Sequence, residues 1–412
     1  MKLLVIDPGL ERRVGHNAGI AEELDLEFGR RKDVHITYAG AAAMKPGDFA
    51  DLRADFLPVF RINGYYPFAL AEIADGDTFA AWEAMLAQEM ASLSLSSYDL
   101  IVMPAAYPLH LRALSQCGAE LRGTPLVCGL LFPARFFSRE AGAEPRVQQI
   151  FGDAIERLRA EAQAFFYSET GRYATDRGLL AMPVLFTPVS RATLDAMEQL
   201  SRTLRAPADR RTVGFFGHAF ARKGFGLLTA AIEKGLPAAV RVVARMPEGE
   251  ENMCWSLNDR STAIDARSAR TSNLEFFGEM AKVDLVFAAY DPAYYRDQMS
   301  GIVPEAICLG KPLIVSRACT CLTEFLDRHA PGSYVSIEYD VDDLLRALDM
   351  PQEDWLRLAA RATASAAAMR THKSAARYLA IAAAGSPHAI LPAAEQAPAG
   401  GALQRLFRRP GN

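Results

Sequence analysis

Short apolar runs alternate along the chain with longer stretches in which apolar residues recur at every third or fourth position. The short runs predict strands buried on both faces, and the longer spacing predicts helices. In the first half of the chain the predicted strands are Leu3–Ile6, Val34–Tyr38, Leu100–Met103, Leu126–Phe132, Ala164–Tyr167 and Val184–Phe186. In the second half they are Val213–Phe216, Val240–Val243, Leu274–Phe277, Leu285–Ala288, Leu313–Val315 and Tyr334–Ile337. Because strands and helices alternate, each series predicts a doubly wound α/β domain with a parallel sheet.

The connection between the two series predicts a domain boundary near residue 190. Thr187–Ser190 contains a proline, a helix is predicted for Thr193–Leu204, and the polar segment Ala206–Arg211 has the composition of a hinge. We therefore expect a first domain over residues 1–190 and a second over residues 191–350.

The part of the chain after Pro351 has a different composition. Alanine, which has the highest helix propensity, is frequent over residues 351–384, and this predicts one or two helices that pack back on the first domain. Proline, glycine and alanine dominate residues 385–412, so we expect a disordered tail. Its segment Leu403–Arg409 is basic and amphipathic, which fits either a solvated tail or peripheral contact with the inner face of a membrane.

Composition bounds the class of protein. The chain has 412 residues, half of them hydrophobic, which is enough to bury two cores. The net charge of −4 gives no electrostatic reason to bind nucleic acid. The apolar start at Met1–Asp7 reads as a first strand and not as a signal peptide, and no apolar run reaches the length of a membrane helix. The six scattered cysteines fit a reducing compartment, so we expect a cytoplasmic protein.

A glycine-rich turn follows the first strand of the second domain. It runs from Gly214 to Gly224 and precedes a predicted helix over Phe225–Ile232. Arg222 and Lys223 stand directly before this helix, which is the end where the helix dipole disfavours cations. Contact with a diphosphate explains the pair, since a guanidinium and an ammonium neutralise phosphate charge; a solvated basic pair is the alternative.

A second segment, Tyr295–Val315, has the features of a sugar-nucleotide site. Asp297 precedes Glu305 by eight positions, across the Ser300-Gly301 turn. This turn opens a predicted helix that ends near Gly310, so unpaired backbone N–H groups are available to a diphosphate. Glu305, in the early turns of that helix, can accept hydrogen bonds from ribose hydroxyls.

In the first domain, the turn after the first strand supplies polar groups between Gly15 and Gly19, namely His16 and Asn17. This turn lacks the dinucleotide-binding fingerprint, and a flexible surface loop is the alternative. His110 follows a later strand, where it either faces the ligand or packs among apolar neighbours.

With Gly217–Gly224, the predicted strand Leu274–Gly278 and Ser300–Val315 in this order, the chain resembles retaining GT-B glycosyltransferases of the family 4-like group, also called glycosyl transferases group 1. The resemblance covers most of residues 1–384 and is strong only in the second domain. It implies two Rossmann-like domains facing a central cleft. The second domain of such enzymes binds the nucleotide-sugar donor, and the first binds the acceptor.

The resemblance also assigns residues. It implies that Lys223 holds the pyrophosphate, that Glu305 holds the ribose, and that Asp297 faces the donor sugar. The donor site it implies is completed by Gly217, His218 and Arg222 in the glycine-rich turn and by the backbone of Ser300, Gly301, Ile302 and Val303.

Three positions depart from the family pattern. Asp297 replaces a glutamate, and His218 replaces an arginine. The run Thr124–Pro133 also ends without the histidine that many family members carry after the fourth strand. His16 is the best first-domain candidate for a catalytic side chain, beside Asp297 and Lys223.

We therefore expect a glycosyltransferase of polysaccharide or glycoconjugate biosynthesis that moves a sugar from a nucleotide-sugar to a hydroxyl acceptor, which can be a glycan, a lipid-linked or a small molecule. Transfer is expected to retain the anomeric configuration. No Asp-x-Asp motif stands where a metal-dependent transferase needs one, so no metal and no cofactor are expected. The alternatives are a nucleotide-binding or scaffold protein of this shape without activity, and an epimerase or inverting transferase with His16 as base.

Overall fold

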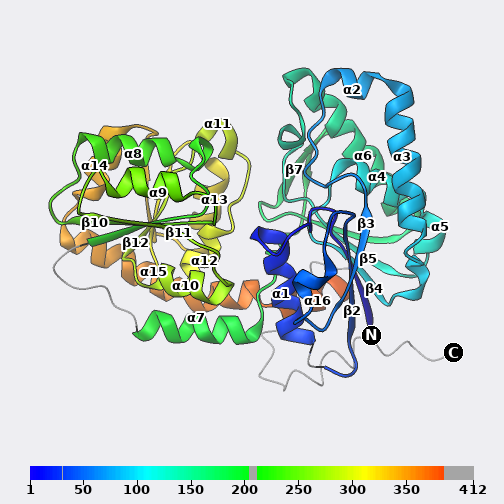
Figure 1. Cartoon of the computed structure of the whole chain (residues 1–412), viewed down its shortest axis with the longest axis horizontal. Helices are drawn as coiled ribbons and strands as arrows, with labels where there is room; N and C mark the ends of the chain where they lie inside the picture. Colours follow the sequence, from blue (N-terminus) through cyan, green and yellow to red (C-terminus); the bar gives the residue numbers. More distant parts are fainter. Residues whose placement is uncertain (30, 204–210, 385–412) are drawn as a thin grey trace. The chain divides into compact units, whose positions relative to one another are not determined.

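The computed structural model describes residues 1–29, 31–203 and 211–384. The described chain divides into two compact units, one formed by Met1–Arg191 and residues 373–384, the other by Ala192–His372 (Figure 1). Most of the predicted hinge Ala206–Arg211, the tail from residue 385 and its segment Leu403–Arg409 lie outside the described residues.

The first unit contains a parallel sheet of six strands in the order β3-β2-β1-β4-β5-β6. The strands are β1 (Lys2–Ile6), β2 (His35–Ala41), β3 (Asp55–Phe60), β4 (Leu100–Met103), β5 (Pro125–Gly129) and β6 (Gln163–Tyr167). A short antiparallel hairpin of β7 (Arg172–Thr175) and β8 (Gly178–Ala181) follows. The strand order reverses between β1 and β4, which is the switch point where open α/β sheets bind ligands.

Helices cover both faces of this sheet. They are α1 (Gly15–Phe28), α2 (Leu70–Ala74), α3 (Gly76–Ala91), α4 (Pro108–Gln116), α5 (Gly118–Leu121), α6 (Glu144–Glu161) and α16 (Ala375–Ala384). Alternate residues of β1 point into two separate cores, Leu4 and Ile6 into one, Leu3 and Val5 into the other. This explains why the strand is apolar at consecutive positions.

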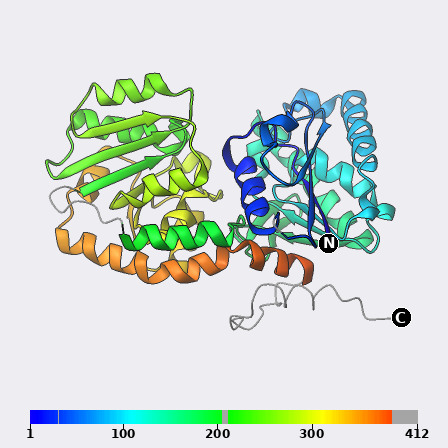
Figure 2. The same ribbon diagram turned by 60° about the horizontal axis from the view of Figure 1, so that its bottom comes forward.

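The C-terminal helix α16 completes the second of these cores. Tyr378 and Leu379 are buried there, and the Tyr378 hydroxyl lies 2.9 Å from that of Tyr167 at the end of β6. Figure 2 shows α16, near the red end of the colour scale, beside the N-terminal part of the chain in blue. The chain thus returns to its first unit after the long helix α15 (Gln352–Lys373).

The second unit repeats the topology, with a parallel sheet in the order β11-β10-β9-β12-β13-β14. Its strands are β9 (Arg211–Phe216), β10 (Val240–Met246), β11 (Ile264–Ser268), β12 (Leu285–Ala288), β13 (Leu313–Ser316) and β14 (Tyr334–Ile337). The remaining helices are α7 (Arg191–Thr203), α8 (Phe225–Lys234), α9 (Glu251–Asn258), α10 (Asn273–Ala281), α11 (Pro292–Tyr295), α12 (Ile302–Cys308), α13 (Thr320–His329) and α14 (Val341–Leu348). Helices α8, α9 and α14 lie on one face of the sheet, and α10 and α12 on the other (Figure 1).

Two of the predicted strands are wrong. Leu274–Phe277 lies in helix α10, whose start is fixed by a capping box: Ser272 accepts the backbone N–H of Glu275, and the Glu275 carboxylate accepts that of Ser272. Val184–Phe186 forms only an isolated bridge with Ser168. The predictions also missed the edge strands β3 and β11 and the hairpin β7–β8. Strands β7 and β11 alternate between more and less exposed residues, Pro58 interrupts the apolar run of β3, and β8 is short and largely exposed.

No helix within the described ranges is both long and apolar enough to cross a membrane.

Candidate functional site

The carboxyl edge of the second sheet gathers most of the predicted donor-site residues. Strand β9 lies between β10 and β12, where the strand order reverses, and it leads directly into the glycine-rich turn. Gly217, the first residue after β9, has a φ of 107°, which only glycine adopts without strain. Gly224 closes the turn with a φ of 74°, and a Cβ there would lie 2.1 Å from the Ala289 carbonyl oxygen. The loop shape therefore requires both glycines.

Lys223 lies near the end of this turn, directly before Gly224. Its ammonium nitrogen lies 3.0 Å from the position that a Cβ of Gly217 would occupy, so the side chain folds back over the start of the turn. Burial lowers the Lys223 pKa, and the neighbouring Arg222 charge lowers it further, while Glu305 and Glu250 oppose the shift. Cations and carboxylates from three segments of the chain thus act on one another at this edge.

His218 follows Gly217 in the turn and is held by Glu250, a residue that the sequence did not suggest. Its Nδ1 lies 2.7 Å from Oε1 of Glu250, and the backbone N–H of Ala219 donates to Oε2 of Glu250, also at 2.7 Å. The imidazole stacks on the Phe220 ring at 4.8 Å between centroids, and the Arg222 guanidinium lies 4.9 Å from the centre of that ring. These contacts order the exposed part of the loop.

Glu305 comes from the start of helix α12. It is half-buried, and Oε1 lies 3.5 Å from the position of a Cβ on Gly301, so the carboxylate turns back toward the beginning of the helix. Ser300 is buried, and its hydroxyl lies 3.1 Å from that of Tyr290, which directs the Ser300 side chain inward. Only the backbone of Ser300 is therefore suited to a ligand.

The other residues predicted in this segment differ in their exposure to solvent. Ile302 and Val303 are buried, and the Val303 N–H already donates to the Ser300 carbonyl at 3.1 Å, so it is not available to a phosphate in this structure. Asp297 is exposed in the bend between α11 and α12. The role of Asp297 stays a prediction.

His16, the third predicted catalytic residue, belongs to the first unit. It is the second residue of α1, at the carboxyl edge of the first sheet, and its side chain is exposed. The pKa of His16 is nevertheless lowered. Desolvation by surrounding protein atoms is the largest cause, the Lys373 ammonium adds to it, and the Glu169 carboxylate opposes it. The structure therefore groups His16 with these two buried residues of its own unit.

Asn17, the neighbour of His16, is used by the protein itself. Its amide nitrogen donates to Oδ1 of Asp7 at 2.5 Å, and its carbonyl oxygen accepts from the Tyr65 hydroxyl at 2.6 Å. Asp7 is buried, which raises its pKa to about 6. His110 is buried as well, with Nε2 at 2.9 Å from the Ile62 carbonyl oxygen, and burial lowers its pKa to about 3. Asn17 and His110 are thus structural residues.

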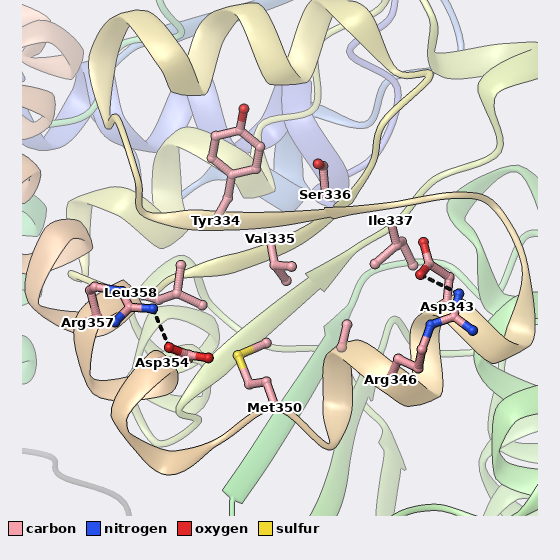
Figure 3. Close-up of a pocket in the computed structure, with 11 residues that line it drawn as sticks. Tyr334, Val335, Ser336, Ile337, Asp343, Arg346, Met350, Asp354, Arg357 and Leu358 are labelled. Atoms are coloured by element: carbon pink, nitrogen blue, oxygen red, sulfur yellow. Dashed lines mark hydrogen bonds and ion pairs between the residues drawn. The ribbon is translucent and has the colours of Figure 1, made fainter.

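Concave surface exists elsewhere in the second unit. A pocket of about 380 Å³ lies between edge strand β14 and helices α14 and α15. In Figure 3, Val335 and Ile337 point toward the helices, where Arg346 pairs with Asp343 and Arg357 pairs with Asp354. None of the residues that line this pocket belongs to the glycine-rich turn or to α12, so it is a separate feature.

Among the residues that the structure describes, no group of three or more histidine, cysteine, aspartate or glutamate side chains is arranged to hold a metal ion.

The candidate site thus consists of Gly217, His218, Arg222 and Lys223 from the turn, Glu305 and the start of α12, and Glu250. Sequence reasoning missed Glu250, which follows strand β10 and stands 32 positions from His218. The signal that could have found it is its place: in a parallel sheet, the residues after neighbouring strands meet at the same edge.

Comparison with known proteins identifies the fold of the chain that carries this site. No model of a known protein family matches the chain, and no curated protein matches its sequence. Several solved structures match over nearly the whole length. HepE from Anabaena in complex with UDP-glucose is 16% identical, with 93% of this chain and 98% of that chain covered and a TM-score of 0.59.

Two other structures extend the likeness. A UDP-forming α,α-trehalose-phosphate synthase from Burkholderia xenovorans is 15% identical, covers 95% of this chain and 99% of its own, and has a TM-score of 0.56. The glycosyltransferase SnogD from Streptomyces nogalater is 14% identical, with 92% and 99% covered and a TM-score of 0.50. The chain therefore has the GT-B fold, as the sequence predicted. At these identities the likeness shows the fold alone.

Proposed function

We propose that the protein is a nucleotide-sugar-dependent glycosyltransferase whose donor site is the carboxyl edge of the second sheet. The observation that carries this proposal is the placement of the Lys223 ammonium over Gly217, within the electrostatic field of Arg222 and Glu305. Two adjacent cations on the turn between β9 and α8 suit a diphosphate, and a carboxylate near the start of α12 suits ribose hydroxyls.

The donor is proposed to be a uridine diphosphate sugar. HepE was solved with UDP-glucose, and the trehalose-phosphate synthase is named as UDP-forming, so UDP is the first nucleotide to test. In the proposed reaction the bond between the anomeric carbon and the diphosphate breaks, the acceptor oxygen bonds to the same face of that carbon, and the acceptor proton leaves with the diphosphate. Lys223 and Arg222 stabilise the leaving group, and Asp297 contacts the sugar.

The protein's contribution in this scheme is position and charge, and no metal ion is required. Because the two cations neutralise the diphosphate, they take the place that a divalent ion fills in other transferases. The anomeric configuration of the donor is retained, since the acceptor attacks from the face that the leaving group vacates. The acceptor is a hydroxyl compound, and His16 of the first unit is the residue proposed to contact it.

Calorimetric titration with UDP, GDP and ADP, followed by slow hydrolysis of the matching nucleotide-sugar with and without EDTA, tests the proposal. We expect micromolar binding of one nucleotide, loss of that binding in Glu305→Ala, and donor hydrolysis that EDTA leaves unchanged. Lys223→Ala should slow hydrolysis by hundreds-fold, the effect of about 2.7 to 4 kcal/mol that one charge-stabilising contact contributes. Lys282→Ala, which removes an exposed lysine paired with Glu279, is the matched control.

The outcomes separate the alternatives. Failure to bind any nucleotide would overturn the donor site. Binding without hydrolysis, persisting after many acceptors have been offered, would favour a nucleotide-binding protein without activity. Hydrolysis that EDTA abolishes and magnesium restores would refute the metal-independent scheme.

A further inference from the structure

Glu250 occupies a position that its own helix does not explain. Its backbone is the N-cap of α9, yet its side chain makes no capping hydrogen bond to that helix. The carboxylate instead points to the turn after β9, where it contacts Nδ1 of His218 and the N–H of Ala219, both at 2.7 Å. The Glu250 side chain is only 16% exposed, whereas that of His218 is 51% exposed. The largely buried Glu250 carboxylate thus orients the His218 imidazole.

This contact fixes the chemistry of the histidine ring. A carboxylate accepts hydrogen bonds only, so Nδ1 of His218 carries the proton in the pair. Stacking on Phe220, with an angle of 6° between the rings, fixes the plane of the imidazole. The ring nitrogen that remains for a ligand is Nε2. In the charged form of the ring Nε2 also carries a proton, so a ligand that accepts a hydrogen bond from Nε2 requires that form.

We propose that Glu250 is a positioning residue that acts through His218, holding the imidazolium so that Nε2–H donates to the diphosphate of the donor. The inference rests on the proposed function, since it presumes a diphosphate beside Lys223. It assigns three cations to the diphosphate, Lys223, Arg222 and His218, of which the last depends on its carboxylate partner.

A double-mutant cycle tests the route through His218. The variants are Glu250→Gln, His218→Ala and the double variant, each titrated by calorimetry with UDP and with uridine, which lacks the phosphates; if another nucleotide binds, its own nucleoside replaces uridine. We expect Glu250→Gln to weaken UDP binding about tenfold, the effect of losing one hydrogen bond to a charged group. Uridine binding should stay unchanged, and Glu250→Gln should have no further effect in the His218→Ala background.

Glu251→Gln is the matched control, because Glu251 is the exposed neighbour whose carboxylate accepts from Gly249 and Ser268 and does not contact His218. Equal weakening of UDP and uridine, or additive effects of the two substitutions, would show a structural role and overturn the inference. If the unaltered protein binds no nucleotide, the donor site itself is refuted. The two failures are therefore distinguishable.

Nitrogen-15 spectra of histidine side chains give a measurement that does not depend on any variant folding. In the unaltered protein, UDP should shift the Nε2 resonance of His218 and bring it into the protonated range, whereas uridine should leave it in place. An Nε2 resonance that does not respond to UDP, in a protein that binds UDP, would contradict the inference.

Discussion

Gly217 carries two constraints at one residue. Its φ of 107° lies outside the range that side chains tolerate, and a Cβ would lie 3.0 Å from the Lys223 nitrogen. Of the two, the approach to Lys223 bears on the proposed donor site, because the lysine side chain would have to shift to make room for a methyl group. A methyl group at this position therefore acts on the cation as well as on the backbone.

We predict that Gly217→Ala weakens UDP binding at least about tenfold and destabilises the second unit by roughly 1 to 3 kcal/mol, the cost of a strained φ. Gly226→Ala is the control: Gly226 lies in α8 with no atom within 4 Å of its Cβ position, so alanine should leave UDP binding unchanged and stabilise the helix slightly. Calorimetry and thermal unfolding measure both quantities. Normal UDP affinity in Gly217→Ala would show that Lys223 does not contact the nucleotide.

The candidate site was predictable from the sequence where residues are neighbours in the chain. The turn around Lys223 and the helix start near Glu305 are each a continuous segment, and their residue types indicate phosphate and hydroxyl binding. Glu250 forms no such segment: it joins His218 only because β9 and β10 are adjacent in the sheet. The hydrogen bond from the Val303 N–H to the Ser300 carbonyl could not be predicted either, since it depends on the conformation of the turn.

At the level of elements, the central strands and the edge strands β6 and β14 were predictable, whereas the edge strands β3 and β11 were not. Strands such as β4 and β12 are buried on both faces and therefore read as continuous apolar runs. Strand β3 lies at an edge, contains Pro58 and exposes several of its residues, so its pattern is interrupted. The apolar run at Leu274–Phe277 belongs to α10 because a local capping signal outweighs its strand-like composition.

The start of α10 gives an element-scale prediction. Ser272 accepts the N–H of Glu275 and closes the capping box, so Ser272→Ala should lower the free energy of unfolding of the second unit by about 1 kcal/mol. Urea titration followed by circular dichroism measures the change in midpoint. Ser256→Ala serves as the control, since Ser256 is exposed inside α9, where alanine favours the helix. Equal midpoints for the two variants would contradict the role of the cap.

At the scale of the whole molecule, the two units share a strand order but have separate cores. On the face of the second sheet that α8, α9 and α14 cover, a core cluster contains residues of β9 to β14, and it shares no residue with the two clusters described for the first unit. Binding and stability are therefore expected to be local to a unit. A nucleotide that binds the turn around Lys223 should stabilise the unit that contains it.

Hydrogen exchange tests this separation. With UDP at 100 times its dissociation constant, the second unit should gain about 2.7 kcal/mol, so its slowest amides should exchange about 100-fold more slowly. We expect this slowing in β9 and β12 and unchanged exchange in β4 of the first unit, as read by mass spectrometry of peptides. Glu305→Ala with UDP is the control and should show no slowing. Equal slowing in β4 would mean that the two units unfold together or that both contact the nucleotide, and the donor site could then not be assigned to the second unit alone.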